Sequence, residues 1–303
     1  MTEAYPVVAA LCREGFPLAA VCAVLAVSRS AYYAYRQDRV TRLKEEDQML
    51  KPLIRELFRR HKRRYGARRI AKQLAAQGVA CGPRRAARLL RELKLQAIQP
   101  KSFKPRTTDS RHTLGYSPNL LADAPEPQAM NRLWVADITY IPLPNARFAY
   151  AALVMDRYSR RIVGWDVQPH MQEALPRAAL QQALRARRPA AELIHHSDRG
   201  GQYAGGEYRR LLTQFRLRQS MSRAANCYDN AFMESCFGTI KTELEMEQYA
   251  SLEIARKELA AYIRYYNTQR LHSALDYRTP LGFEQRQAAA GAAGKTAARA
   301  KPP

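Results

Sequence analysis

Two aspartates stand at positions where an acid is costly unless it has a partner, and a glutamate follows them on a predicted helix. Asp137 lies inside the strand-like run 134–141, Asp198 directly follows the strand-like run 193–197, and Glu234 lies in a helical pattern. Buried carboxylates are unfavourable unless they are paired or bound to metal. Hard divalent cations prefer oxygen ligands, and two acids at one edge of a sheet suit such an ion. The sequence therefore predicts a divalent-cation site built from these acids.

A basic residue accompanies the third acid. Lys241 follows Glu234 by seven residues, and seven residues come within about 20° of two full helical turns. Glu234 and Lys241 therefore share one helix face, about 10.5 Å apart along its axis. This spacing allows the carboxylate to bind a metal ion while the ammonium group meets a neighbouring phosphate.

The elements that must position these residues follow from the periodicity of residues 131–248. The pattern predicts three strands, a helix, a strand, a helix, a strand and a last helix. Their expected ranges are 134–141, 148–155, 161–167, 173–186, 193–197, 208–214, 217–220 and 229–247. This order is that of ribonuclease H, an α/β fold in which helices cover a mixed sheet. Asp156, Asp166 and Asp229 are expected in turns or helix caps.

The charge is concentrated before this region. The net charge is +23, and residues 51–115 carry nineteen basic against three acidic residues, a net of +16. Such a block favours a polyanion such as nucleic acid, although a solvated helical face gives the same pattern. Helical stretches near 53–58, at 69–77 and from Pro83 are typical of a helix-turn-helix or of a plain helical hairpin. The predicted DNA-contacting residues are Arg59, Arg60, Lys62, Arg63, Arg64, Arg68, Arg69, Arg84, Arg85 and Arg88.

The remaining segments complete the expected organisation. Helices at 7–15, 18–25 and 29–36 repeat the helix-turn-helix pattern more weakly, and tyrosines on the third could meet DNA or pack on a neighbouring domain. The proline-rich stretch 99–130 reads as a linker. The expected divisions are 1–42 (small helical segment), 43–98 (basic helical region), 99–130 (linker), 131–248 (α/β core), 249–286 (helical extension) and 287–303 (disordered basic tail).

Several functional classes are excluded. The longest apolar run, 16–27, has about 12 residues, short of the roughly 20 that a spanning helix needs. Five cysteines without CxxC pairing favour reduced thiols over disulfides or zinc. From the short apolar run and the reduced cysteines together, we expect a soluble intracellular protein without membrane contact. No phosphate-binding nucleotide loop is present. His195, His196 and His272 are expected to be structural, because no paired His/Cys array accompanies them.

The acidic motifs together resemble a known family. Asp137 in the run 134–140, Asp198 in the run 196–203 and Glu234 in the run 229–235 resemble the D-D-E triad of transposases and retroviral integrases, with 35 residues between the last two acids and Lys241 seven residues later. The residues that flank these acids, together with the stretch 265–272 and Thr279-Pro280, resemble the insertion-sequence-three family of bacterial transposases. Within that family, the chain resembles the product of the downstream reading frame.

The resemblance implies a ribonuclease H-like integrase core, preceded by an all-α helix-turn-helix-type region. It implies an enzyme in which Asp137, Asp198 and Glu234 bind two Mg²⁺ or Mn²⁺ ions that serve both ends of a phosphodiester exchange. One step nicks the element end, and the freed 3′-OH then attacks target DNA. Implied partners are terminal inverted repeats, target DNA and further copies of the chain. An upstream-frame protein or fusion is also implied, because in this family the upstream frame supplies a leucine zipper and this sequence has no sustained heptad repeat. The implied location is the bacterial cytoplasm, at the nucleoid.

Two other interpretations remain open from the sequence. One is a helix-turn-helix DNA regulator whose integrase-like domain is not catalytic. The other is a metal-dependent nuclease of the same fold, which would cleave DNA without joining strands.

Overall fold

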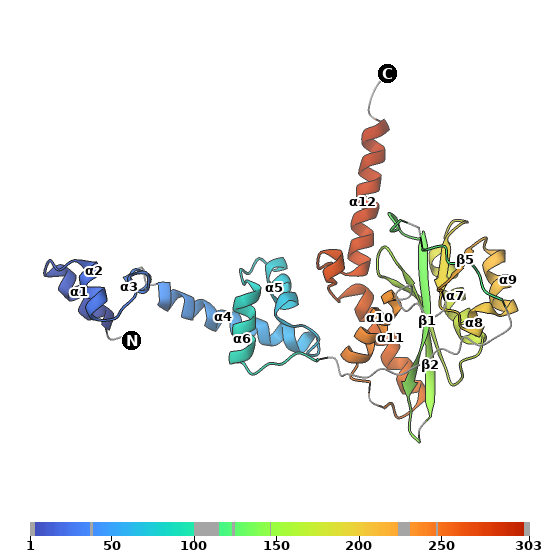
Figure 1. The fold of residues 1–303 in the computed structure, drawn as a ribbon, viewed down its shortest axis with the longest axis horizontal. Helices are drawn as coiled ribbons and strands as arrows, with labels where there is room; N and C mark the ends of the chain where they lie inside the picture. Colours follow the sequence, from blue (N-terminus) through green and yellow to red (C-terminus); the bar gives the residue numbers. More distant parts are fainter. Residues whose placement is uncertain are drawn as a thin grey trace. The chain divides into compact units, whose positions relative to one another are not determined.

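The computed structural model describes residues 4–36, 39–99, 115–122, 125–145, 147–223, 231–246 and 248–299. The chain forms two compact units, Met1–Ala97 and Ile98–Pro303. Each unit is described by itself below (Figure 1).

The first unit is helical throughout its described regular structure. Its helices are α1 (Ala4–Arg13), α2 (Leu18–Val24), α3 (Arg29–Arg36), α4 (Arg39–Arg60), α5 (Ala67–Ala76) and α6 (Pro83–Glu92). Proline is favoured in the first turn of a helix, which explains the start of α6 at Pro83. The all-α prediction for this region is confirmed. The boundary expected between residues 42 and 43 falls inside α4, because the stretch that crosses it is rich in helix-forming Leu, Lys and Glu.

The second unit contains a five-stranded mixed sheet. Its strands are β1 (Leu133–Pro142), β2 (Phe148–Asp156), β3 (Ile162–Gln168), β4 (Ile194–Ser197) and β5 (Arg218–Met221). The spatial order is β3-β2-β1-β4-β5. The pairs β1–β2 and β2–β3 are antiparallel, whereas β1–β4 and β4–β5 are parallel. This topology confirms the ribonuclease H-like prediction and makes β1 the central strand.

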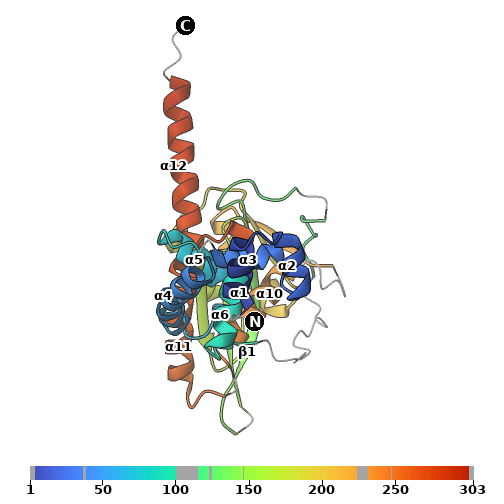
Figure 2. The same ribbon diagram turned by 90° about the vertical axis from the view of Figure 1, so that its left-hand side faces the viewer.

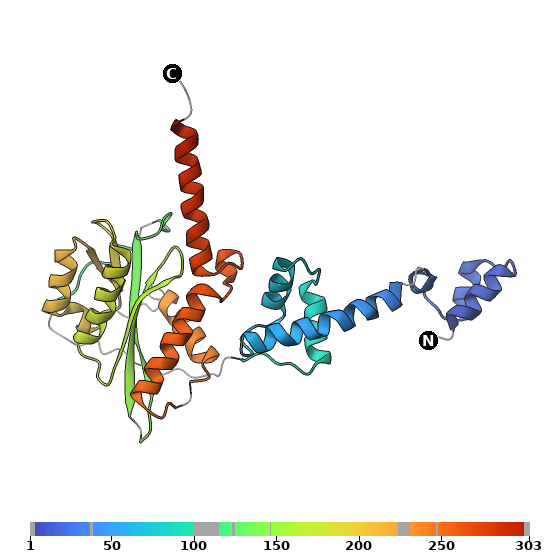
Figure 3. The same cartoon turned by 180° about the vertical axis from the view of Figure 1, so that it is seen from behind.

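Helices cover both faces of this sheet (Figures 1 and 3). On one face lie α7 (Ala174–Arg187), α8 (Gly201–Ala204) and α9 (Gly206–Gln214). On the other lie α10 (Ala231–Glu243) and α11 (Leu252–Thr268), and a 3₁₀ turn (Ser273–Leu275) leads to α12 (Pro280–Arg299). The central strand is therefore covered on both sides, which is why β1 and β2 are almost wholly apolar.

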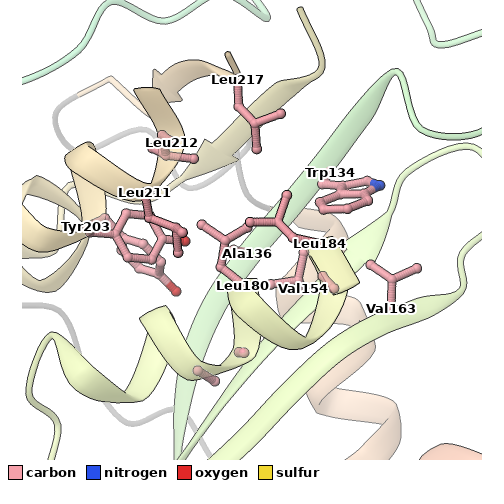
Figure 4. Packing of buried hydrophobic residues seen from close by; sticks show 14 of the residues in the cluster. Trp134, Ala136, Val154, Val163, Leu180, Leu184, Tyr203, Leu211, Leu212 and Leu217 are labelled. Atoms are coloured by element: carbon pink, nitrogen blue, oxygen red, sulfur yellow. The ribbon is translucent and has the colours of Figure 1, made fainter. Parts of the chain in front are cut away.

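The core between the sheet and α7 is closely packed. Trp134 and Ala136 of β1 meet Leu180 and Leu184 of α7 in one buried cluster (Figure 4). Gly164 of β3 faces the same helix, and a Cβ placed there would lie 2.1 Å from the carbonyl oxygen of Ala179. Only glycine lets β3 and α7 approach so closely, and this contact fixes the sheet against its covering helix.

Two expected segments differ in the structure. Part of the expected linker, residues 115–122, lies along the edge strand β5, where the Leu120 N–H donates to Ser220 Oγ at 2.9 Å; residues 100–114 and 123–124 lie outside the described residues. The expectation of a disordered tail at 287–303 is wrong as far as Arg299, where α12 ends. The run is rich in alanine, the strongest helix former, and this outweighs its glycines.

Among the described helices, none is by itself long and apolar enough to cross a membrane. By length and composition alone, α2 and α3 pass that test together, as a pair bent by 111°.

Candidate functional site

Asp137 lies in the middle of the central strand. It is paired across the antiparallel ladder with Leu153 of β2, and its Oδ1 accepts a 2.8 Å hydrogen bond from the Ile138 N–H. β1 is buried from Leu133 to Ala136 and becomes partly accessible at Asp137. The carboxylate therefore stands where the uninterrupted run of buried residues ends, and buried and partly accessible residues follow it.

Asp198 is brought level with Asp137 by the parallel pairing of β1 and β4. The register pairs Val135 with His196, and continuing it by two residues places Asp198 beside Asp137. Oδ1 of Asp198 accepts a 3.0 Å hydrogen bond from the Gly200 N–H. A Cβ at Gly200 would lie 3.1 Å from that same oxygen and 2.7 Å from Gln202 Oε1. Glycine at position 200 thus lets the backbone turn tightly around the Asp198 carboxylate.

Glu234 and Lys241 both project from α10, which packs against β1. Glu234 is exposed in the first turn of the helix. Lys241 is half-buried, with Nζ 3.9 Å from the centroid of the Tyr140 ring on β1. Burial lowers the pKa of Lys241, and the charge of Asp137 opposes this shift. The ammonium group of Lys241 is therefore held at the same strand as the first acid.

The three acids interact electrostatically. Burial, followed by the charge of Asp198, raises the pKa of Asp137 well above its ordinary value; Glu234 adds to the shift, while the Ile138 N–H and Lys241 oppose it. Ionised carboxylates so placed repel one another, and a divalent cation with oxygen ligands would remove the repulsion. The donor set of these residues thus fits such an ion, although no three His, Cys, Asp or Glu side chains in the described part of the chain are already arranged to hold one.

The first turn of α10 is held by two arginines from the β2–β3 turn. The guanidinium carbons of Arg157 and Arg160 lie 3.6 Å and 4.0 Å from the centroid of the Phe232 ring. The turn itself is organised by Asp156, which is fully buried and accepts from the N–H groups of Tyr158 and Ser159. Phe232 precedes Glu234 by two residues, so this contact holds the turn of α10 from which Glu234 projects.

The last turn of α10 is held by a buried polar cluster. Glu243 accepts from Arg270 and from the Tyr262 hydroxyl, and Arg270 reaches His272 Nδ1 at 3.4 Å. The His272 ring packs edge-on against Tyr266 at 4.5 Å. From the sequence, the stretch 265–272 is recognised only as a motif that resembles the family, and no structural role is predicted for it. Its spacing gave no sign that Glu243 is the partner.

Two histidines near Asp198 have structural surroundings. His195 and His196 are fully buried in β4. His195 Nε2 lies 3.1 Å from the Tyr208 hydroxyl, and His196 Nδ1 lies 2.8 Å from Ser220 Oγ. These contacts agree with the expected structural role of both side chains.

The predicted DNA-contacting residues separate into two groups in the first unit. Around the α4–α5 turn, five of them are exposed: Arg59, Arg60, Lys62, Arg63 and Arg68. Lys62 and Arg63 have left-handed backbone angles, with φ of 48° and 62°, and the turn is closed by the Arg63 N–H donating to the Phe58 carbonyl. Arg64 and Arg69 are half-buried, and Arg69 Nη1 donates to the Arg64 carbonyl.

On α6, the predicted basic stripe is divided. Arg84 is exposed. Arg85 and Arg88 instead form ion pairs with Asp47 of α4 at 2.8 Å and 2.6 Å, and Arg88 also pairs with Glu92 at 2.6 Å. Burial raises the pKa of Asp47, but hydrogen bonds from both arginines outweigh it and the net shift is downward. These two arginines therefore join α6 to α4, a role that helical spacing could not reveal.

Comparison with known families defines the class of protein. A model described as an integrase core domain matches residues 127–227, and a second with the same description matches residues 216–280. A model described as an HTH-like domain matches residues 44–103. The chain thus joins a helix-turn-helix-like unit to an integrase core.

Similar proteins identify the family more narrowly. The chain is 41% identical over 268 residues to an uncharacterised 31 kDa protein of insertion element IS600 from Shigella sonnei, covering 88% of this chain and 98% of that protein. It is 36% identical over 278 residues to transposase InsF of insertion sequence IS3A from Escherichia coli, covering 90% and 96%. The chain belongs to the insertion-sequence-three family of transposases.

A solved structure is similar as well. The catalytic core domain of HTLV-2 integrase in complex with magnesium matches with a TM-score of 0.42 and 15% identity, over 51% of this chain and 96% of that one.

Proposed function

We propose that this protein is a transposase that cleaves DNA at the ends of an insertion sequence and joins the resulting 3′-OH to target DNA. The observation that carries the proposal is the placement of Asp137 on the central strand β1, of Asp198 directly after the paired strand β4, and of Glu234 on α10, which packs against β1. These positions lie within the two integrase-core matches. The names of the relatives as transposases support the same reaction.

The roles of the three acids follow from their oxygen chemistry. Asp137, Asp198 and Glu234 would together hold the Mg²⁺ or Mn²⁺ ions. When bound, the ions would activate the attacking oxygen and stabilise the leaving oxygen of the phosphodiester. Lys241 would offer its ammonium group to a phosphate beside Asp137, from the position over Tyr140 where it is held.

The reaction needs no covalent protein intermediate. In the first step, water attacks the phosphodiester at the element end, the 3′-oxygen of the element's last nucleotide leaves as a free 3′-OH, and the flanking strand keeps the 5′-phosphate. In the second, the freed 3′-OH attacks a phosphodiester of target DNA and displaces its 3′-oxygen. One bond forms for each that breaks, so no external energy source is required.

DNA binding is assigned to the predicted residues that are exposed at the α4–α5 turn, to Arg84 and to Lys241. The exposed residues at the α4–α5 turn are well placed for phosphate contacts, and the HTH-like match supports a DNA-binding role. Each phosphate contact makes the affinity depend on salt. Paired element ends would require more than one copy of the chain, and an upstream-frame protein would supply recognition of the terminal repeats.

The experiment is a cleavage and strand-joining assay on duplex DNA that carries the terminal repeat, with Mg²⁺ or Mn²⁺. The wild type should nick the end and join it, whereas Glu234→Gln and Asp198→Asn should do neither while binding DNA normally. Glu258→Gln is the matched control, because Glu258 is an exposed acid on the neighbouring helix α11, and it should be fully active.

Two results would replace the proposal. If the wild type and Glu234→Gln bind the DNA equally and neither cuts it, the protein is a DNA-binding regulator. If the wild type cuts DNA and never joins strands, it is a nuclease of this fold.

A further inference from the structure

The first three helices form a bundle that lies outside the HTH-like match, which begins at residue 44. The helices α1, α2 and α3 are labelled in Figure 2. They pack around Val8, Val21, Cys22 and Tyr32, all of which are buried. The helices α2 and α3 are bent by 111° relative to each other, and the four residues 25–28 join them. Two helices at about 90–120° with a short connection are the geometry of a helix-turn-helix.

The connection between α2 and α3 is fixed by the backbone. The Val27 N–H donates to the Cys22 carbonyl at 2.9 Å, and the Ala26 N–H donates to the Ala23 carbonyl. Ala26 has a φ of 50°, the left-handed conformation with which helices often end. The end of α2 is therefore closed by hydrogen bonds, and the direction of α3 is set by the turn rather than by a flexible tether.

The outer face of α3 has the composition of a DNA-contacting surface. Arg29, Tyr33 and Arg36 are spaced by four and three residues, so they lie on one helix face, and all three are exposed. Tyr32 points the other way, into the bundle. Neither α2 nor α3 contains an acidic residue, so nothing on these two helices repels a phosphate backbone.

We propose that residues 4–36 are a second DNA-binding helix-turn-helix, in which α3 lies against duplex DNA with Arg29 and Arg36 at phosphates and Tyr33 at a base or sugar edge. The inference rests on the proposed function, which supplies DNA as the partner. DNA is favoured over a protein partner because this face combines two arginines with a tyrosine and lacks acids. The chain would then hold DNA through two separate helical modules, one on each side of the start of α4.

The test measures binding of the full chain to a labelled duplex of random sequence at several salt concentrations. The variant that combines Arg29→Ala with Arg36→Ala should reduce the slope of log affinity against log salt by about 2, since each phosphate contact contributes about 0.9. Tyr33→Ala should weaken binding without changing the slope. Arg13→Ala is the matched control: Arg13 is an exposed arginine of α1 whose Nε donates to the Ala9 carbonyl, and its loss should leave the slope unchanged.

Circular dichroism shows whether each variant remains folded. A second control is Ala26→Gly, which should bind DNA like the wild type because glycine suits the left-handed turn. An unchanged salt slope in the double arginine variant overturns the inference. So does a changed sedimentation coefficient with unchanged DNA affinity, which would make the face a protein contact. Cleavage is assayed in parallel. If the wild type never cleaves DNA but the double arginine variant shows the reduced slope of log affinity against log salt, the proposed function fails and this inference stands.

Discussion

Glu243 and Arg270 form a buried bidentate ion pair that joins the end of α10 to the segment after α11. Arg270 Nη2 donates to Glu243 Oε1 at 2.7 Å and Arg270 Nε donates to Glu243 Oε2 at 3.0 Å, while both side chains are 7% exposed. The Tyr262 hydroxyl also donates to Glu243 Oε2, at 2.9 Å. Because α10 also bears Glu234, this pair anchors the helix that carries the third of the candidate acids.

Removing one partner of this pair should destabilise the second unit. Glu243→Gln leaves the Arg270 guanidinium buried without a counter-charge, and we expect a loss of about 3–5 kcal/mol in the free energy of unfolding. Tyr262→Phe removes one hydrogen bond and should cost about 1 kcal/mol. Both tryptophans, Trp134 and Trp165, lie in the sheet, so their fluorescence during urea unfolding follows this unit. Equal urea midpoints for Glu243→Gln and the wild type would contradict the anchoring role.

His195 should make the second unit sensitive to moderate acid. Burial, and then the charge of His196, lowers the pKa of His195 to about 3. The unfolded chain binds this proton near pH 6.5 and the folded chain does not, so stability present above pH 6.5 is lost as the pH falls towards 3. The slope should reach about 1.4 kcal/mol per pH unit. His195→Gln retains a polar group beside the Tyr208 hydroxyl and should show a flatter profile in urea unfolding; an identical slope would refute the assignment.

Local patterns in the sequence predicted the strands and helices well, because each depends on neighbours within one element. The run 134–141 reads as a strand by itself, and β1 (Leu133–Pro142) confirms it. That Asp137 and Asp198 stand level depends on the register between β1 and β4, which joins residues 61 positions apart. The positions of the two aspartates at strand ends suggested one edge of the sheet, and the spacing of the family motif indicated the pairing, but neither gave the register.

Arg85 and Arg88 show what helical spacing cannot give. A helical wheel places both on the outer side of α6, but it carries no information about which element faces that side. In the structure Asp47 of α4 faces it, and Asp47 is about forty residues earlier in the chain. Glu243 and Arg270 escaped prediction for the same reason: a buried ion pair between distant residues leaves no periodic signal.

Lys62 offers a way to separate DNA binding from folding. Its φ of 48° is unfavourable for any side chain with a Cβ, by about 1 kcal/mol relative to glycine. Lys62→Gly and Lys62→Ala both remove the charge and should weaken DNA binding equally, with a similar reduction of the salt dependence. Only Lys62→Gly relieves the backbone, so its melting temperature by circular dichroism should exceed that of Lys62→Ala. If Lys62→Gly binds DNA as tightly as the wild type, Lys62 is not a contact.

Asp137→Asn should exchange function for stability. Burial and the charges of Asp198 and Glu234 disfavour the ionised Asp137 carboxylate, whereas a neutral amide keeps an oxygen for the Ile138 N–H and removes the repulsion. Without divalent metal, the variant should therefore unfold at higher urea than the wild type. Mg²⁺ at ten times its dissociation constant should stabilise the wild type by about 1.4 kcal/mol and the variant by much less. Equal stabilisation of both proteins by Mg²⁺ would place the ion elsewhere. If the variant were less stable than the wild type in metal-free buffer, the acids would not repel one another in the folded chain.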